Sequence, residues 1–250
     1  MIMINPVFFE VHSNLPRQGP GNFEATRLAF SHLEMLPDRP RLLDVGCGPG
    51  MQTLDLARLT KGSIVAVDNH QPYVDRLSEK IQQSGLDDRV SVVCADMFDL
   101  PFAPGEFDVI WSEGAIYIIG FDRGLSQWRS LLKPGGYLAV SELTWLQPNP
   151  PEAVRSFWEE GYPAMRTMDE NLAAIEENGY AIVDAFPLPE SAWWDDYYSP
   201  LEQRISKLQR KYSSNAEALQ VLDMERQEID LYRRYSKFYG YVFYIAKLPA

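Results

Sequence analysis

The sequence predicts an α/β protein in which a mostly parallel sheet of seven strands carries helices on both faces. Two observations predict this fold class. Short runs of β-branched residues alternate with amphipathic segments between residues 24 and 145, which is typical of βαβ units. A glycine-rich turn also follows the first run, at the change from strand to helix. Right-handed crossovers then distribute the helices over both faces of one sheet.

The elements follow from the spacing of these runs. Five short apolar runs are predicted as strands, at residues 41–45, 63–67, 90–94, 107–111 and 136–142. The amphipathic segments are predicted as helices, at residues 23–36, 53–59, 71–84 and 124–132. One domain is expected for residues 1–250, because a single large α/β domain commonly reaches this length.

The regular alternation stops after Glu142. A proline-rich stretch leads to a predicted helix at 152–160, and two later runs, 181–186 and 241–246, are expected to add strands at the sheet edge. Roughly fifty residues separate these two runs, too many for a plain loop. They are predicted as a C-terminal helical and aromatic insertion before the last strand, which covers the core as a lid and contains helices at 201–212 and 216–238.

Composition argues against several classes of protein. The net charge of -12 and the isoelectric point near 4.7 repel phosphate backbones, so no nucleic-acid partner is expected. The two cysteines and three histidines lack metal-ligand spacing, so no metal site is expected. The N-terminus does not resemble a signal peptide and no apolar run reaches the length of a membrane span. A cytoplasmic protein without membrane contact is therefore expected.

The first predicted strand ends in the glycine-rich turn Asp44-Val45-Gly46-Cys47-Gly48-Pro49-Gly50. Glycines permit positive φ and a close approach of the backbone, so a ligand can lie against main-chain N–H groups and a helix N-terminus. A dinucleotide fingerprint requires glycine at position 51, which is Met51 here. The turn therefore predicts a ligand other than a nicotinamide dinucleotide.

Acidic residues close the second and third predicted strands. Asp68 stands where a carboxylate of a doubly wound fold accepts both hydrogen bonds of a ribose diol. Asp96 can accept from an exocyclic amine, and Met97 can lie on an aromatic base. Simpler interpretations stay open: Asp68 or Asn69 as a helix cap, and Asp96 as a turn residue. For Cys47, burial as a small packing residue is favoured over a nucleophile.

These motifs, taken in order, resemble the class I S-adenosylmethionine-dependent methyltransferases. The resemblance spans about residues 40 to 145 and includes the fourth strand and a Lys-Pro-Gly-Gly turn before the fifth. The run Trp-Ser-Glu-Gly-Ala-Ile-Tyr at 111–117 resembles the branch near the ubiquinone/menaquinone-biosynthesis methyltransferases. The family's fold is Rossmann-like, its cofactor is S-adenosylmethionine, and a small-molecule methyl acceptor is the expected partner.

The resemblance also implies a division of labour along the chain. Residues 1–145 are expected to form the cofactor-binding core, 146–240 the variable acceptor-site and lid insertions, and 241–247 the last strand. In the resembling branch, the segment Arg17-Gln18-Gly19-Pro20-Gly21 closes over the cofactor, although an ordinary turn before a helix explains it almost as well. The implied cofactor contacts are Gln18, Gly19, Asp44, Gly46, Cys47, Gly48, Gly50, Asp68, Asn69, Asp96, Met97 and Ser112.

Two residues are candidates for catalysis. Methyl transfer from a sulfonium is an in-line displacement, so alignment alone can supply much of the rate and a general base is optional. Glu113 directly follows the fourth strand and is the first candidate base, with Tyr117 one helical turn later as the second. Glu113 can equally hold the amino group of the cofactor's methionine or cap the next segment.

The aromatic run Trp193-Trp194-Asp195-Asp196-Tyr197-Tyr198 cannot all face inward, so part of it is expected to line the acceptor site or a subunit contact, the latter in a homodimer. Three other functions compete with methyl transfer. One is an S-adenosylmethionine-binding protein without turnover that acts as an interaction module. An aminopropyltransferase is disfavoured because its acid-rich pattern is absent, and nicotinamide chemistry is opposed by Met51. The acceptor and the methylated atom stay open.

Overall fold

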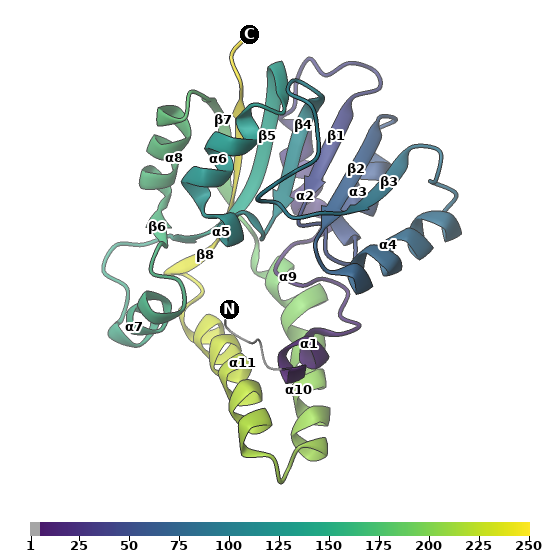
Figure 1. Cartoon of the computed structure of the whole chain (residues 1–250). Coiled ribbons are helices and arrows are strands. Elements are labelled where there is room, and N and C mark those ends of the chain that lie inside the picture. The colour runs from purple at the N-terminus through teal and green to yellow at the C-terminus, as the bar shows by residue number, and fades with distance from the viewer. Residues whose placement is uncertain (1–5) are drawn as a thin grey trace.

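The computed structural model describes residues 6–250, so the first five residues of the expected 1–145 core lie outside the described part. A twisted sheet flanked by helices forms one end of the molecule, and a long helical hairpin projects from the other (Figure 1). The predicted α/β class with a mostly parallel sheet is confirmed. Within the described residues, no helix combines the length and apolarity that crossing a bilayer requires.

The sheet runs in the order β3-β2-β1-β4-β5-β8-β7, with β6 paired to β5. Its strands are β1 (Arg41–Val45), β2 (Ser63–Asp68), β3 (Val90–Cys94), β4 (Phe107–Glu113), β5 (Leu132–Trp145), β6 (Arg166–Thr167), β7 (Ala181–Pro187) and β8 (Tyr239–Lys247). β1 to β5 are parallel, whereas β8 is antiparallel to both β5 and β7. This order reverses between β1 and β4, which places the carboxyl ends of those strands at a switch point.

Three strand predictions need correction. The structure adds an eighth strand within residues 6–250, β6, whose two residues are too few for a sequence pattern to reveal. β5 begins four residues before and ends three residues after the predicted 136–142, because it pairs with β4, β8 and β6 along its length. β8 begins two residues before and ends one residue after the predicted 241–246, and together with β7 it extends the sheet at its edge as expected.

Helices cover both faces of the sheet. Buried residues of α2 (Phe23–Ser31), α3 (Met51–Leu59) and α4 (Gln71–Gln83) pack on one face, and those of α5 (Ile116–Ile119), α6 (Phe121–Arg129) and α8 (Met168–Glu177) on the other. The helix predicted at 124–132 begins and ends three residues earlier, because residue 132 already pairs with β4. The helix predicted at 23–36 ends at Ser31, and Met35 has a positive φ that interrupts a helix.

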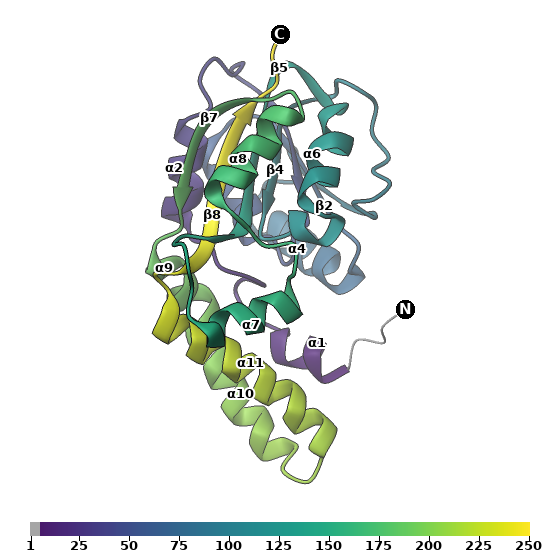
Figure 2. The same cartoon turned by 90° about the vertical axis from the view of Figure 1, so that its left-hand side faces the viewer.

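The C-terminal insertion is built on α10 (Ser199–Lys211) and α11 (Ala216–Tyr235), an antiparallel pair that projects away from the sheet (Figure 2). A third buried cluster joins this pair to α1 (Pro6–His12), α7 (Glu152–Gly161), α9 (Glu190–Trp193) and the π-helical turn η1 (Trp194–Tyr198). The aromatic run at 193–198 is helical, whereas the insertion was predicted to be helical only from residue 201. Packing against α11 favours this helical conformation: the ring of Trp193 stacks on that of Tyr232 of α11, with 4.0 Å between the ring centroids.

Candidate functional site

A cavity of about 870 Å³ lies between the carboxyl ends of the parallel strands and the helical insertion. Its sheet half is lined by the glycine turn after β1 and the ends of β2 and β4. Its helical half is lined by α1, α7, η1 and α11, which contribute mainly aromatic and acidic side chains. Pockets that bind small molecules occupy roughly 300–1,000 Å³, so this volume can hold a nucleoside-sized ligand and part of a second molecule.

The glycine turn presents its backbone to the cavity. Gly46 and Gly48 both have positive φ, which only glycine adopts without strain. The N–H groups of Gly46 and Cys47 donate to the carbonyl oxygen of Val67 at 2.8 and 2.9 Å, which fixes the turn against β2. A Cβ added at Gly48 would meet only the Gln18 side chain, at 3.6 Å, so the turn faces open space there. The predicted residues Gly46, Cys47 and Gly48 all line the cavity.

Asp68 ends β2 beside this turn and lines the cavity. One carboxylate oxygen accepts the Gly48 N–H at 2.9 Å and the other accepts the His70 N–H at 2.8 Å. Each oxygen keeps a second lone pair, so the carboxylate can still accept two hydroxyl groups. The N-cap residue of α4 is His70, so neither Asp68 nor Asn69 occupies that position. Asn69 and Met97 line the same half of the cavity.

Four of the predicted cofactor contacts do not line the cavity. Asp44 is fully buried beneath the turn and accepts a hydrogen bond from Thr53 at 2.5 Å; burial and the Glu113 carboxylate raise its pKa to about 7. Gly50 is the N-cap residue of α3, and the buried Ser112 hydroxyl donates to the Val45 carbonyl. Asp96 accepts the Phe98 N–H in an exposed turn.

Cys47 is buried and has no disulfide partner in the described residues. Burial, together with the carboxylates of Asp44 and Asp68, raises the pKa of its thiol well above the ordinary value. The thiol is therefore neutral and a poor nucleophile. The structure favours the packing interpretation of this cysteine.

Glu113 lies in the cavity wall at the end of β4, where three donors hold its carboxylate. Arg17 donates to one oxygen at 2.9 Å, and Thr26 and Trp111 donate to the other at 2.7 and 2.9 Å. The same guanidinium reaches Asp55 of α3 at 2.8 Å. These bonds fasten the segment before α2 to the end of β4, and a carboxylate held by three donors, one of them a guanidinium, is poorly placed to remove a proton.

Sequence reasoning named Arg17 only as the start of a shaped loop. The structure shows why residue 21 is glycine: a Cβ there would lie 2.7 Å from the Arg17 guanidinium and 2.9 Å from Glu113. Gln18 and Gly19 line the cavity, and Gln18 bridges α1 and α4, donating to the His12 carbonyl and accepting from the Tyr73 hydroxyl. The sequence feature that could have indicated this role of Arg17 is a lone arginine in a glycine-rich segment.

The helical half is aromatic and acidic. Trp193 and Tyr197 from the aromatic run line it, as does Tyr117, whose ring meets Tyr162 edge to face. Desolvation, with the nearby carboxyl groups of Glu228 and Glu142, raises the pKa of Tyr117, so its phenolate is scarce at neutral pH. Tyr117, the second candidate base, is thus held in its protonated form.

Three ionisable residues in this half escaped the sequence reasoning. His12 of α1 contacts Glu225 of α11, with 3.2 Å between Nε2 and Oε1. Glu228 accepts the Tyr198 hydroxyl at 2.8 Å, and desolvation with the Glu225 charge raises its pKa to about 7. Residues 213 positions apart share no local pattern, so only the fold brings His12 and Glu225 together.

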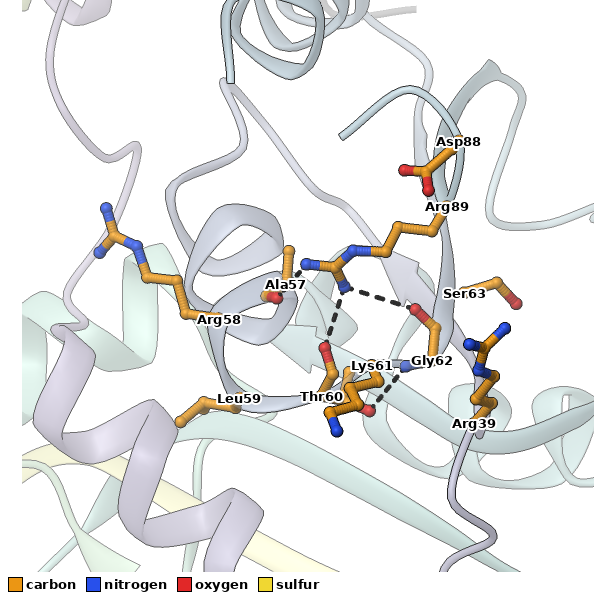
Figure 3. A pocket seen from close by; sticks show the side chains of 10 residues that line it. All are labelled: Arg39, Ala57, Arg58, Leu59, Thr60, Lys61, Gly62, Ser63, Asp88 and Arg89. Carbon is orange, nitrogen blue, oxygen red and sulfur yellow. Dashed lines mark hydrogen bonds between the residues drawn. The ribbon is translucent and has the colours of Figure 1, made fainter. Parts of the chain in front are cut away.

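A second pocket, of about 700 Å³, lies at the amino ends of β1 and β2 (Figure 3). Among its lining residues, Arg89 donates to the carbonyl oxygens of Ala57, Thr60 and Gly62, which Figure 3 draws as dashed lines. The guanidinium therefore ties the loop after α3 to β3. In open α/β sheets ligands bind at the carboxyl ends of the strands, so the larger cavity is the candidate site.

A glycine turn and a strand-end acid meeting at one cavity define a nucleoside-binding α/β protein. A family model described as a methyltransferase domain matches residues 42–136. The chain is 30% identical over 239 residues to 27-O-demethylrifamycin SV methyltransferase from Amycolatopsis mediterranei, covering 90% of this chain and 84% of that protein. The chain belongs to the class I S-adenosylmethionine-dependent methyltransferases.

Solved structures agree on the fold. A methyltransferase from Geobacter sulfurreducens, crystallised with S-adenosyl-L-homocysteine, superposes with a TM-score of 0.82 at 21% identity over 100% of both chains. The [4+2]-cyclase SpnF superposes with a TM-score of 0.75 at 22% identity, covering 98% of this chain and 92% of that one. Likeness at these identities shows the fold alone, and the second protein is named for a cyclisation.

Proposed function

We propose that this protein transfers the methyl group of S-adenosylmethionine to a hydroxyl group of a small, largely apolar molecule. One observation carries the proposal: a single cavity joins the glycine turn and Asp68 to an aromatic, acidic chamber. Methyl transfer needs donor and acceptor in line within one water-poor space, and this cavity offers a binding surface for each.

The sheet half fits the cofactor. Asp68 retains two acceptor positions for the ribose hydroxyls, and Gly48 leaves open space where any side chain would intrude. Met97 offers an apolar surface to the adenine. The other implied contacts, Asp44, Gly50, Ser112 and Asp96, would act by shaping the turn and its surroundings, because they lie outside the cavity lining.

The helical half favours a neutral, apolar acceptor. Trp158, Trp193 and Tyr197 supply aromatic walls, and the acids Glu225 and Glu228 repel anions. Among the described residues that line the cavity there is one arginine, Arg17. Its guanidinium is already held by Asp55 and Glu113. Oxygen is proposed as the methylated atom because the Amycolatopsis relative is named for a 27-O-demethyl compound.

Several finer expectations remain part of this proposal. The resemblance to the ubiquinone/menaquinone branch rests on the run at 111–117 alone. An acceptor other than nucleic acid follows from the net charge of -12. The cytoplasmic setting and a homodimer stay predictions.

The test uses the full-length protein, S-adenosylmethionine labelled in its methyl group, and an organic extract of cells. We expect label in a product that partitions into organic solvent and carries one additional methyl group on oxygen, as seen by mass spectrometry and NMR. Calorimetric titration with S-adenosylhomocysteine runs in parallel. Binding without any labelled product would support the interaction module instead, and label found only in macromolecules would reject a small-molecule acceptor.

A further inference from the structure

The helical half of the cavity contains a histidine–carboxylate pair that no sequence motif indicates. His12 ends α1 and Glu225 lies at the middle of α11. Nε2 of His12 lies 3.2 Å from Oε1 of Glu225, and the two side chains are only 7% and 12% exposed. Both residues line the cavity. An imidazole oriented by a carboxylate at a cavity wall is an arrangement in which histidine can act as a general base.

The contact with Glu225 indicates which ring nitrogen of His12 carries the proton. Because Nε2 faces the carboxylate, we place the imidazole proton on Nε2 and the free lone pair on Nδ1. Within residues 6–250, Nδ1 has no hydrogen-bond partner and does not belong to the fully buried polar atoms that lack one, and His12 lines the cavity. The rings of Phe8 and Tyr197 lie against the imidazole, at centroid distances of 4.6 and 6.3 Å. The ring is therefore fixed, with its acceptor nitrogen accessible.

α1 holds this ring at the junction of the two cavity halves. On the side of the hairpin, the Glu10 carboxylate of α1 accepts from Lys211 and Tyr212 at 2.7 and 2.6 Å. On the side of the sheet, Gln18 donates to the His12 carbonyl oxygen at 3.0 Å and accepts from Tyr73 of α4 at 2.6 Å. The same Gln18 side chain faces Gly48 of the glycine turn. His12 thus stands between the cofactor surface and the aromatic chamber.

Other acids of the cavity wall are engaged or partly protonated. Asp68 accepts two main-chain N–H groups, and Glu113 accepts from three side chains. Glu228 accepts from Tyr198, and desolvation raises its pKa to about 7. Glu225 faces the imidazole. Nδ1 of His12 is left as the best-placed proton acceptor of the helical half.

We propose that His12 is the general base that removes the proton of the acceptor hydroxyl, and that Glu225 positions its ring. This rests on the proposed function. When bound, S-adenosylmethionine supplies an electrophilic methyl group. The hydroxyl proton moves to Nδ1, and an oxygen lone pair forms the new carbon–oxygen bond. The carbon–sulfur bond breaks with its electron pair going to sulfur, which leaves S-adenosylhomocysteine. The imidazolium then releases its proton to water.

The surrounding charges suit this step. An imidazolium formed at His12 lies beside Glu225, with Glu228 close enough to interact electrostatically. Both carboxyl groups therefore stabilise the charge that proton transfer creates. They would also repel an acceptor that is already anionic, which matches a hydroxyl that is neutral until it reaches the base.

The test compares His12→Gln with a matched control, His32→Gln. His32 forms a similar pair with Asp184 at 3.0 Å, but both of those side chains are about one third exposed or more, and neither lines the cavity. The readouts are calorimetric affinity for S-adenosylhomocysteine and the initial rate of label transfer into the organic extract. For His12→Gln we expect affinity within about twofold of wild type and a rate at least roughly 10²-fold lower. His32→Gln should match wild type in both.

Two further measurements separate proton transfer from mere support of the fold. His12→Ala should regain part of its rate when imidazole is added, because a free imidazole can enter the space that the side chain leaves. Glu225→Gln should lower the rate about tenfold, and Glu225→Asp should restore most of it. Thermal melting of each variant checks that it is folded, and the imidazole comparison stays informative for a partly destabilised one.

An unchanged rate of label transfer in His12→Gln would overturn the proposal. A lower rate in Glu228→Gln, without a lower rate in His12→Gln, would overturn it too. Failure of imidazole to restore any rate to a folded His12→Ala protein would also overturn it. These outcomes differ from failure of the proposed function, in which the wild-type protein itself transfers no label to the extract.

Discussion

The guanidinium of Arg17 lies 2.9 Å from the carboxylate of Glu113 and joins the N-terminal segment to the end of β4. Both side chains are about 95% buried, and a second buried carboxylate, Asp55, lies 2.8 Å from the same guanidinium. Breaking a buried ion pair leaves charges without partners, which costs far more than losing an exposed pair. This contact explains why a loop with two glycines and a proline has one fixed path over the cavity.

Replacing Arg17 by methionine should destabilise the fold by about 3 kcal/mol, because the buried carboxylates of Asp55 and Glu113 both lose the guanidinium that lies between them. Urea unfolding measures the change. The control is Arg27→Met, which removes an exposed pair with Glu24 and should cost less than about 1 kcal/mol. Equal effects of the two substitutions would show that the buried network contributes nothing special.

Glu113→Gln tests the first candidate base against the structural interpretation. The amide can accept from some of the three donors but offers an N–H₂ group to Arg17, so we expect a loss of about 2 kcal/mol in unfolding free energy. Label transfer by the folded fraction should stay within a few-fold of wild type. A 10²-fold lower rate with unchanged S-adenosylhomocysteine affinity would restore Glu113 as the base.

Asp68→Ala should weaken S-adenosylhomocysteine binding by about 1.5–3 kcal/mol, the range for hydrogen bonds to a charged group. Calorimetric titration gives the value, and a thermal melt confirms that the protein is folded. Asp96→Ala is the natural comparison, since Asp96 was expected to contact the adenine yet lies in an exposed turn outside the cavity. A smaller loss for Asp96 is expected, and the reverse order would refute the ribose assignment.

Gly48→Ala should lower the affinity for S-adenosylhomocysteine roughly tenfold. The added methyl group would stand in the cavity against Gln18, in addition to about 1 kcal/mol of strain from a φ of +51°. Gly85→Ala is matched in strain, with a φ of +62° and open space around its Cβ, but it does not line the cavity. Similar binding by both variants would mean that the cofactor does not approach the turn.

Glu142 makes the stability of the protein depend on pH. Burial raises its pKa to about 8, well above its ordinary value, and neither carboxylate oxygen has a hydrogen-bond partner among the described residues. The folded state therefore keeps the proton that the unfolded state releases. The resulting stability is complete below the ordinary pKa near 4.5 and is lost as pH rises through about 8.

Glu142→Gln should remove this dependence. Relative to wild type, the variant should gain on the order of 2 kcal/mol in unfolding free energy between pH 6 and pH 9. Denaturant titrations at the two pH values measure the gain. The exposed Glu152→Gln serves as control and should leave the pH dependence of wild type intact. An identical slope for Glu142→Gln would show that this carboxyl group is ionised in the folded protein.

The sequence alone determined the local parts of the core. The strands at Arg41–Val45 and Val90–Cys94 have the predicted bounds, and the glycine turn and Asp68 meet at the cavity as expected. Such features can be predicted because apolar periodicity, the positive φ of glycine and the common edge of parallel strands act within short windows or follow directly from strand direction.

Only the tertiary structure decided the partners of distant segments. β8 enters the sheet between β5 and β7, Arg17 meets Glu113 across 96 positions, and His12 meets Glu225 across 213. The free energy that selects such contacts comes from burying whole helices and strands against one another. No short run of residues therefore predicts them. The glycine turn and the strand-end acid could therefore be predicted from the sequence, whereas the helical half of the cavity that faces them depends on packing.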